Sequence, residues 1–308
     1  MTVIRSQFTP LLEPTLRDIR NDAKFPRREV IYSRFYDRLD SKKATETVYN
    51  RAGLGSFQVK NEGGPISFTD PIAGTTITFT HIRWGNAYRI AQEMLDHDQY
   101  DEIRKLEMDL QISGDDHLEV EGHRLLTSGF GTTNSNGFRA TGFDALALFS
   151  TAHTRLDGGT TQANRPATDV DLGWTALSAA RQQFQKWNDH RGRPILSRPQ
   201  LLICYPDDEP IARELLGSEL KPGTANNELN ALKGAMEYIV SPYLTDTDAW
   251  FIKGDISNSI WFWDNGARPR TTTIPYDEIN ELMQRKMVMG FSMGHGEWAG
   301  WYGSSGGA

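Results

Sequence analysis

The chain has 308 residues, of which 38% are hydrophobic, and a formal net charge of −7 that arises from 33 Lys and Arg against 40 Asp and Glu. This length is enough for one large domain or two modest ones, and the acidic balance argues against tight, sequence-independent binding of nucleic acid, which requires clustered cations. No apolar run is long enough to span a membrane, and the N-terminal sequence MTVIRSQFTP lacks the apolar stretch of a signal peptide, so we expect no membrane partner and synthesis in a reducing cytoplasm.

The N-terminal part of the chain predicts an arm followed by a long hairpin. Residues 1–54 are rich in Arg, Asp and Lys without a sustained period, which predicts an arm that lies on another part of the structure. Residues 55–84 alternate apolar and polar side chains around the turn sequences NEGGP and DPIAG, which predicts a hairpin, and a change of phase after His81 predicts a bulge. Isolated hairpins are marginally stable, so this one either packs on its own domain or reaches onto a neighbouring subunit.

A long amphipathic helix is predicted over residues 98–126. Ile103, Leu106 and Leu110 follow helical spacing, and charged residues fill the other faces. The sequence SGDD at 113–116 could end one helix and cap another, and we favour one long helix with a bend there. Because only one side is apolar, we expect the helix to lie across a sheet. The following stretch up to residue 170 is rich in loop residues.

The middle of the chain predicts a compact α/β unit. Residues 172–192 form an amphipathic helix pattern, QLLICYP predicts a buried strand that contains the single cysteine, Cys204, and DDEPIARELLGS predicts a helix with Asp207 or Asp208 at its N-cap. Further strands are predicted at MEYIVSPYL, AWFIKG and SIWFW. A second charged helix, YDEINELMQR, then precedes a strand-like end at 285–302, and the tail GSSGGA is expected to be disordered.

Candidate catalytic and metal-binding patterns are incomplete. The loop GFGTTNSNG lacks the Lys-Ser/Thr of a phosphate-binding loop, and TDTD lacks the Gly and Glu of a calcium loop. His295 and Glu297 lie on one face of a strand but are too few for a metal site, and His153 has no nucleophile motif around it. We therefore predict no enzyme activity, catalytic residue, metal or cofactor, and a structural role for His153. A soluble α/β hydrolase that uses His153 stays open as an alternative.

The order of these pieces resembles a known family. Arm, projecting hairpin, one-sided long helix, α/β unit and return strand follow the order of the α+β, Hong Kong 97-type major capsid fold of tailed bacteriophages. The phrases GLGSF, NEGGPISFTD, RIAQEMLDHDQYDEIRKLEMDL, ALFSTAHT, GRPI, SELKPGTANNELNALKG and SPYLTDTDAWFI are most similar to the Mu-like major head subunit group, over roughly residues 50–255. A virion protein that binds glycans, suggested by the Trp-rich C-terminal third, is a further alternative.

The resemblance implies a division of the chain into regions. These are an N-terminal arm (1–54), an E-loop hairpin (55–90), a P-domain with the spine helix (91–170), an A-domain (171–268), and a P-domain return strand with a disordered tail (269–308).

The resemblance also implies a function and a set of partners. The chain is expected to self-assemble into pentamers and hexamers of an icosahedral virion shell, inside the bacterial host, around double-stranded DNA that it does not contact sequence-specifically. No fused helical scaffold is seen at the N-terminus, so a separate scaffolding protein or protease is implied, together with a portal. The candidate inter-subunit contacts are Phe57, Lys60, Glu62, Ile66, Phe68 and Asp70 in the hairpin, and Asn226, Asn227 and Glu228 in the A-domain. The Lys–Asn crosslink of some relatives is not carried over to Lys60.

Overall fold

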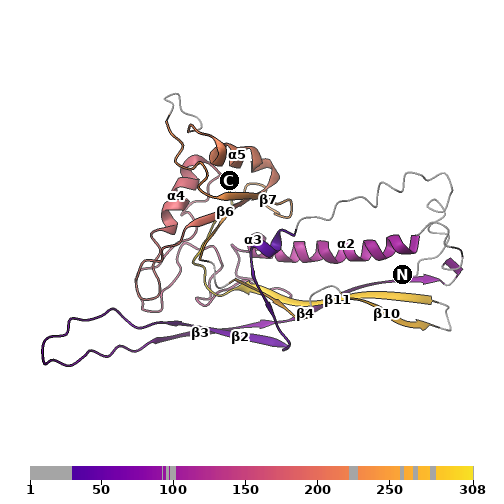
Figure 1. Ribbon diagram of the computed structural model, residues 1–308, viewed down its shortest axis with the longest axis horizontal. Helices are drawn as coiled ribbons and strands as arrows, with labels where there is room; N and C mark the ends of the chain where they lie inside the picture. The colour runs from indigo at the N-terminus through magenta and orange to yellow at the C-terminus, as the bar shows by residue number, and fades with distance from the viewer. Residues whose placement is uncertain are drawn as a thin grey trace.

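A computed structural model shows two β-sheets, a long helix and a projecting hairpin (Figure 1). The large sheet has the order β1 (Asp37–Asp40), β9 (Ile260–Asp264), β11 (Leu282–His295), β10 (Arg270–Asp277), and β4 (Ile82–Ala91) and β5 (Phe138–Arg139) also pair with β11. The structure describes residues 30–91, 93–94, 97, 102–221, 228–256, 260–265, 270–277 and 282–307.

The second sheet has the order β12 (Trp301–Ser304), β8 (Trp250–Gly254), β6 (Pro199–Cys204), β7 (Glu237–Val240). The helices α4 (Trp174–Phe184) and α5 (Glu209–Gly217) belong to this unit, and a short helical turn, η5 (Pro206–Asp208), precedes α5. The predicted helices and strands of the α/β unit are thus confirmed, and so is the burial of Cys204. Asp208 occupies the N-cap position, although its side chain makes no capping hydrogen bond.

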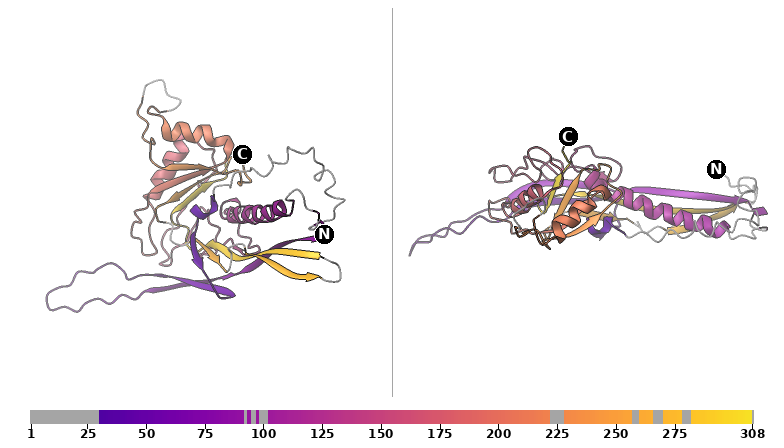
Figure 2. Two further views of the ribbon diagram at one scale, coloured as in Figure 1. Left: turned by 45° about the vertical axis from the view of Figure 1, so that its right-hand side comes forward. Right: turned by 90° about the horizontal axis from the view of Figure 1, so that it is seen from above.

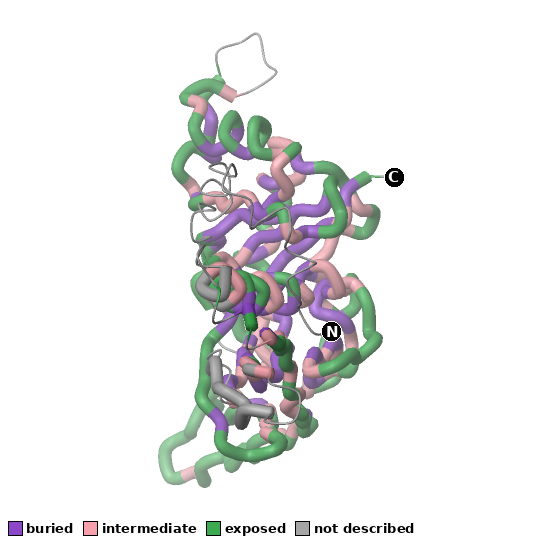
Figure 3. Tube along the Cα trace, turned by 90° about the vertical axis from the view of Figure 1, so that its right-hand side faces the viewer, coloured by how far each residue is buried: buried purple, intermediate pink, exposed green. Residues whose placement is uncertain are grey.

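One continuous cluster of buried side chains joins the two sheets. It runs from Tyr32 and Phe35 of the arm, through Phe262 and Phe291 of the large sheet, to Trp250 of the second sheet. Figure 3 shows these buried stretches along the middle of the molecule, with exposed residues around them. The two sheets and their helices therefore form a single packed unit, which we call the body.

The hairpin projects from the body and is built from β2 (Thr45–Ala52) and β3 (Ile72–Thr80) (Figures 1 and 2). The prediction of strands over residues 55–68 is wrong, because the paired strands lie on either side of that stretch, and residues 53–71 form a loop. The hairpin therefore covers residues 45–80 rather than 55–90. The change of phase at His81 marks a change of sheet instead of a bulge, since β4 leaves β3 and pairs with β11.

The long helix α2 (Glu102–Gly122) lies across β4 and β11, as predicted (Figures 1 and 2). The helix continues through residues 113–116 as one element, as favoured, but runs straight there instead of bending (Figure 1), and it breaks only at His123, before α3 (Arg124–Thr127). Gly114 instead lets the helix approach the sheet: a Cβ atom there would lie 2.5 Å from Sδ of Met287. In the part of the chain that the structure describes, none of the helices is long and apolar enough to cross a bilayer.

The C-terminal part of α2 anchors the described part of the arm. The Glu119 carboxylate accepts hydrogen bonds from the backbone N–H groups of Ile31 (2.9 Å) and Tyr32 (3.1 Å), which begin the short helical turn η4 (Tyr32–Arg34). The Tyr36 hydroxyl donates to the carbonyl of Gly122 at 2.9 Å. The arm thus packs on the end of α2, as expected for a segment without a core of its own, while residues 1–29 lie outside the described residues.

Two predictions for the elements of the C-terminal part are wrong. The predicted helix over 276–285 is a strand in its described residues, since 276–277 belong to β10 and 282–285 to β11, and residues 278–281 lie outside the described part. In β11, Met287, Met289 and Phe291 are buried at every second position, which is the period of a strand. The strand β9, assigned to the A-domain region, pairs with β11 in the large sheet.

The C-terminal tail is ordered up to residue 307, contrary to the expected disorder. The strand β12 pairs with β8, and a Cβ atom at Gly303 would lie 2.9 Å from the rings of Phe149 and Phe251. The Ser304 hydroxyl donates to the carbonyl of Val170 at 2.8 Å. The absence of large side chains, which suggested disorder, is what allows the tail to pack closely against the aromatic core.

Candidate subunit interface

The hairpin loop, residues 53–71, carries large apolar side chains that have no core to enter. Phe57 is 106% exposed, Val59 93%, Ile66 66% and Phe68 96%. Exposed apolar side chains that occur singly are ordinary, but a group of this size on one projecting loop is typical of an interaction surface. The loop also extends well beyond the body, so these side chains reach past the protein's own surface (Figure 1).

The charged candidates of the hairpin loop lie among these apolar side chains. Lys60, Glu62 and Asp70 are exposed, and neither Lys60 nor Glu62 forms an ion pair or a hydrogen bond with any described residue. The Asp70 carbonyl accepts a hydrogen bond from Arg191, which belongs to the body. The structure thus brings all six hairpin candidates together on one loop.

The A-domain candidates are described only at Glu228, which follows α5 in the chain. Asn226 and Asn227 are outside the described residues. Glu228 is exposed, and its carbonyl accepts a hydrogen bond from the backbone N–H of Lys221 at 2.8 Å. The next residue, Leu229, is 83% exposed. Glu228 and Leu229 therefore form a second exposed surface, separate from the hairpin loop.

Asn230 holds the chain that carries this second surface against α5, a role that the sequence did not indicate. Its side chain is buried, donates to the carbonyl of Leu215 at 2.7 Å and accepts from the backbone N–H of Leu232 at 3.0 Å. Buried amides are stable only when such partners are satisfied, so Asn230 holds the returning chain on the end of α5.

The hairpin is attached to the body by an aromatic cluster. Ile77 and Phe79 of β3 are buried against Phe143, and the half-buried Trp261 and Trp263 of β9 pack on them. The rings of Phe79 and Trp261 meet edge to face, with centroids 5.8 Å apart. The side chains around Phe262 lie on both faces of the sheet: Phe262 is buried in the body, and its neighbours Trp261 and Trp263 pack on the hairpin.

Polar contacts complete this attachment, and sequence reasoning missed them. The carboxylate of Glu297 lies 3.0 Å from Nδ2 of Asn50 in β2 and 3.0 Å from Nε2 of His190. The hydrogen bond to Glu297 raises the pKa of His190 above its usual value. Glu297 lies beyond the end of β11, so the predicted same-face pair with His295 does not form. Since His190 and Glu297 are 107 residues apart in the chain, no local pattern could have paired them.

His153, the candidate base of the hydrolase alternative, is a buried structural residue. Nδ1 lies 2.6 Å from the Asp144 carboxylate and Nε2 lies 3.0 Å from Oδ1 of Asn164, while the ring stacks on Trp298 with centroids 4.5 Å apart. Burial alone would raise the pKa of Asp144, but the hydrogen bond and the charge of His153 bring it below its usual value. Both ring nitrogens are occupied, so His153 presents no free nitrogen to a substrate.

The tryptophans that suggested glycan binding are mostly part of the core. Trp250 and Trp301 are 0% exposed and Trp298 is 5% exposed, so their rings cannot stack on an external sugar.

His295, considered above as a metal ligand, is buried in the body, and this burial lowers its pKa to about 3. Among the described residues, no cluster of three or more potential metal ligands occurs.

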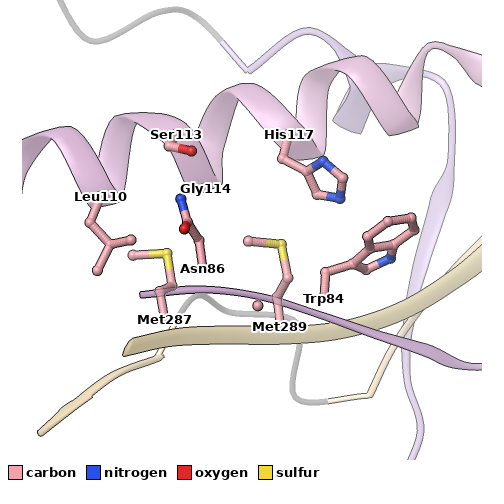
Figure 4. A pocket seen from close by; sticks show the side chains of 9 residues that line it. Trp84, Asn86, Leu110, Ser113, Gly114, His117, Met287 and Met289 are labelled. Carbon is pink, nitrogen blue, oxygen red and sulfur yellow. The ribbon is translucent and has the colours of Figure 1, made fainter. Parts of the chain in front are cut away.

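A pocket of about 200 Å³ lies between α2 and the large sheet, beside their contact (Figure 4). Leu110 and Gly114 of the helix face Met287 and Met289 of β11 across it, and the rings of Trp84 and His117 close one end with centroids 4.6 Å apart. Flexible methionines line the space, so the helix packs on the sheet through adaptable side chains.

Comparison with known proteins identifies the architecture. A family described as phage capsid protein matches residues 74–302, which is more than half of the chain. No curated protein matches it. The capsid of the native GTA particle is similar over 100% of this chain and 99% of that chain (TM-score 0.62, 10% identity). The bacteriophage JBD30 capsid is similar over 80% and 100% (0.59, 13%), and a chain of Mycobacterium phage Patience over 86% and 80% (0.54, 9%). At these identities the structural likeness establishes the fold.

Proposed function

Since the chain belongs to the phage capsid protein family, has the Hong Kong 97-type capsid fold and is a major capsid protein that forms the shell of a tailed-phage head, we propose that its hairpin loop binds a neighbouring copy in that shell. The observation that carries the proposal is the exposure of Phe57, Val59, Ile66 and Phe68. Burying four such side chains contributes roughly 6–12 kcal/mol before the losses of association and ordering.

The proposed contact is heterologous: the loop of one copy meets a different surface of the next. Contacts of this kind close into rings when the rotation between copies allows it, which fits pentamers and hexamers as the units of the shell. Glu228 and Leu229, on the separate A-domain surface, are proposed to meet neighbours around the axis of each ring. Binding free energy is then spread over several surfaces, and no pocket of converging catalytic groups is needed, so we propose that the chain is not an enzyme.

The remaining partners follow from the resemblance. We propose that a separate scaffolding protein or protease and a portal take part in assembly in the host cytoplasm. The net charge of −7 suits a shell that encloses double-stranded DNA without gripping it, because tight phosphate contacts require clustered cations. The closer likeness to the Mu-like head subunit group stays a prediction, and so does the division of the chain into five regions, apart from the corrected bounds of the hairpin.

The test replaces the apolar side chains of the loop and leaves the body intact. A triple variant, Phe57→Ser, Val59→Ser and Phe68→Ser, is compared with Leu196→Ser, which changes a side chain that is 80% exposed outside the hairpin. We expect the triple variant to keep the melting temperature of the parent chain but to form no shells in negative-stain electron microscopy, whereas the control assembles. Normal shells from the triple variant would contradict the proposal.

A further inference from the structure

A tight turn of the body, residues 188–193, lies against the base of the hairpin. The Asp189 carboxylate organises it by accepting hydrogen bonds from the backbone N–H of Arg191 (2.8 Å), the backbone N–H of Arg193 (2.9 Å) and Nε of Arg193 (2.7 Å). Gly192 has a φ of +79°, which a residue with a side chain rarely adopts. Burial would raise the pKa of Asp189, but these hydrogen bonds lower it, so the carboxylate stays ionised and the turn stays closed.

The turn presents the guanidinium of Arg191 to both arms of the hairpin. Nε donates to the carbonyl of Gly53 at 2.8 Å, and Nη2 donates to the carbonyl of Asp70. Pairing of β2 with β3 ends at Ala52 and Ile72, so each carbonyl lies just beyond the last paired residue of its arm. Within the described residues, Arg191 makes the outermost hydrogen bonds between the body and the hairpin.

Because Arg191 contacts the base of the hairpin, a small change of angle there moves the far end of the hairpin loop by a large distance. Half of the loop is about nine residues, which spans roughly 30 Å when extended. A rotation of about 20° at the base therefore moves the exposed apolar side chains by roughly 10 Å. Exposed hydrogen bonds of this kind contribute little to global stability, so their effect falls on direction and not on folding. A guanidinium suits this role because its fixed fork of donors reaches two acceptors at once, which a lysine ammonium does not reproduce.

We propose that Arg191 sets the direction in which the hairpin loop leaves the body, with the 188–193 turn as its support. Arg191 is thus a positioning residue for the subunit contact, and this role rests on the proposed function of the loop. The neighbouring His190 reinforces it, because its contact with Glu297 continues to Asn50 in β2.

The test measures the direction of the loop in the full-length chain. Two spin labels are attached through Lys60→Cys in the loop and Glu214→Cys in α5, and the labelled chain is diluted with unlabelled chain before the distance between labels is measured by double electron–electron resonance. The native Cys204 is buried and burial raises the pKa of its thiol to about 12, so it stays unlabelled. The matched control is Arg181→Met, which removes a guanidinium-to-carbonyl hydrogen bond to Ala231, away from the hairpin.

We expect a narrow distance distribution in the parent and in Arg181→Met, and a distribution at least twice as wide in Arg191→Met and in Arg191→Lys. Melting temperatures should stay within about 2 °C of the parent in all of them. A distribution of parental width in Arg191→Met overturns the role of Arg191 and leaves the proposed function intact. Conversely, normal shells from the triple serine variant of the loop overturn the proposed function, whatever the spin labels report.

Discussion

In the body, Trp250, Trp301 and Phe262 are 0% exposed, whereas in the hairpin loop Phe57 and Phe68 are almost completely exposed. The two regions use the same kind of side chain in opposite environments. In the body, aromatic rings exclude water within one chain, and their loss leaves a cavity. In the loop, the rings stay exposed when the single chain folds, so they add nothing to its free energy of unfolding. We propose that contacts between chains explain their placement, so the two regions should respond differently to the same substitution.

The largest expected difference concerns the loss of one phenylalanine. Phe262→Ala should lower the free energy of unfolding by about 3–5 kcal/mol, because it removes a buried ring and leaves a cavity. Phe57→Ala should change it by no more than about 0.5 kcal/mol, because the ring is exposed in the folded chain. Urea unfolding of the unassembled chains measures both. Equal losses of unfolding free energy would show that Phe57 packs within its own chain, which would contradict the difference between the body and the hairpin loop.

A buried histidine of the body should make it sensitive to acid. The His123 ring donates from Nδ1 to the carbonyl of Glu119 and accepts from the Ser241 hydroxyl at Nε2, both at 2.7 Å, and burial lowers its pKa to about 4. The unfolded chain binds a proton near pH 6.5 and the folded chain does not. The stability is therefore complete above pH 6.5 and is lost as the pH falls towards 4, by up to about 3 kcal/mol.

The matched variant is His123→Gln, which cannot take up this proton. The advantage of the parent over His123→Gln in urea unfolding should be about 2 kcal/mol smaller at pH 4.5 than at pH 7.5. Other buried histidines, such as His295, occur in both proteins and cancel in the difference. An advantage that does not change with pH would show that protonation of His123 does not destabilise the folded chain.

At the hairpin base the pH dependence should be smaller and of opposite sign. Glu297 raises the pKa of His190, so the stability from this pair is complete below pH 6.5 and is lost as the pH rises through the folded pKa. The advantage of the parent over Glu297→Gln should fall by about 0.5–1 kcal/mol between pH 5.5 and pH 8.5. Glutamine keeps an acceptor for Asn50, so the change isolates the charge. An advantage that grows with pH would contradict the ion pair.

Local patterns predicted the elements whose partners lie within the body. The run LLIC of β6 is buried on all sides, and the apolar face of α4 packs as its period indicates. The same reasoning failed for the described residues of YDEINELMQR, because the charges are spaced as on a helix while pairing with β4 and β10 determines a strand. The pairing of β11 with β4 joins distant parts of the chain and leaves no local signal.

The hairpin shows a different limit of prediction from local sequence patterns. Alternating Phe57 with Val59 and Ile66 with Phe68 predicts strands only if one face can be buried, and in the single chain these side chains reach no core. The candidate residues on the loop could be predicted from their composition, but the residues that hold it could not. Arg191, His190 and Glu297 come from distant parts of the chain, and each looks like an ordinary surface residue until the fold brings them to the hairpin.

The central claim is that the exposed side chains of the hairpin loop are buried by a neighbouring copy. Electron cryomicroscopy of shells assembled from the full-length chain tests it most directly, at a resolution that shows side chains. We expect Phe57 and Phe68 to contact an adjacent subunit and to lose most of their exposure to solvent. Shells in which both rings remain exposed to solvent would contradict it.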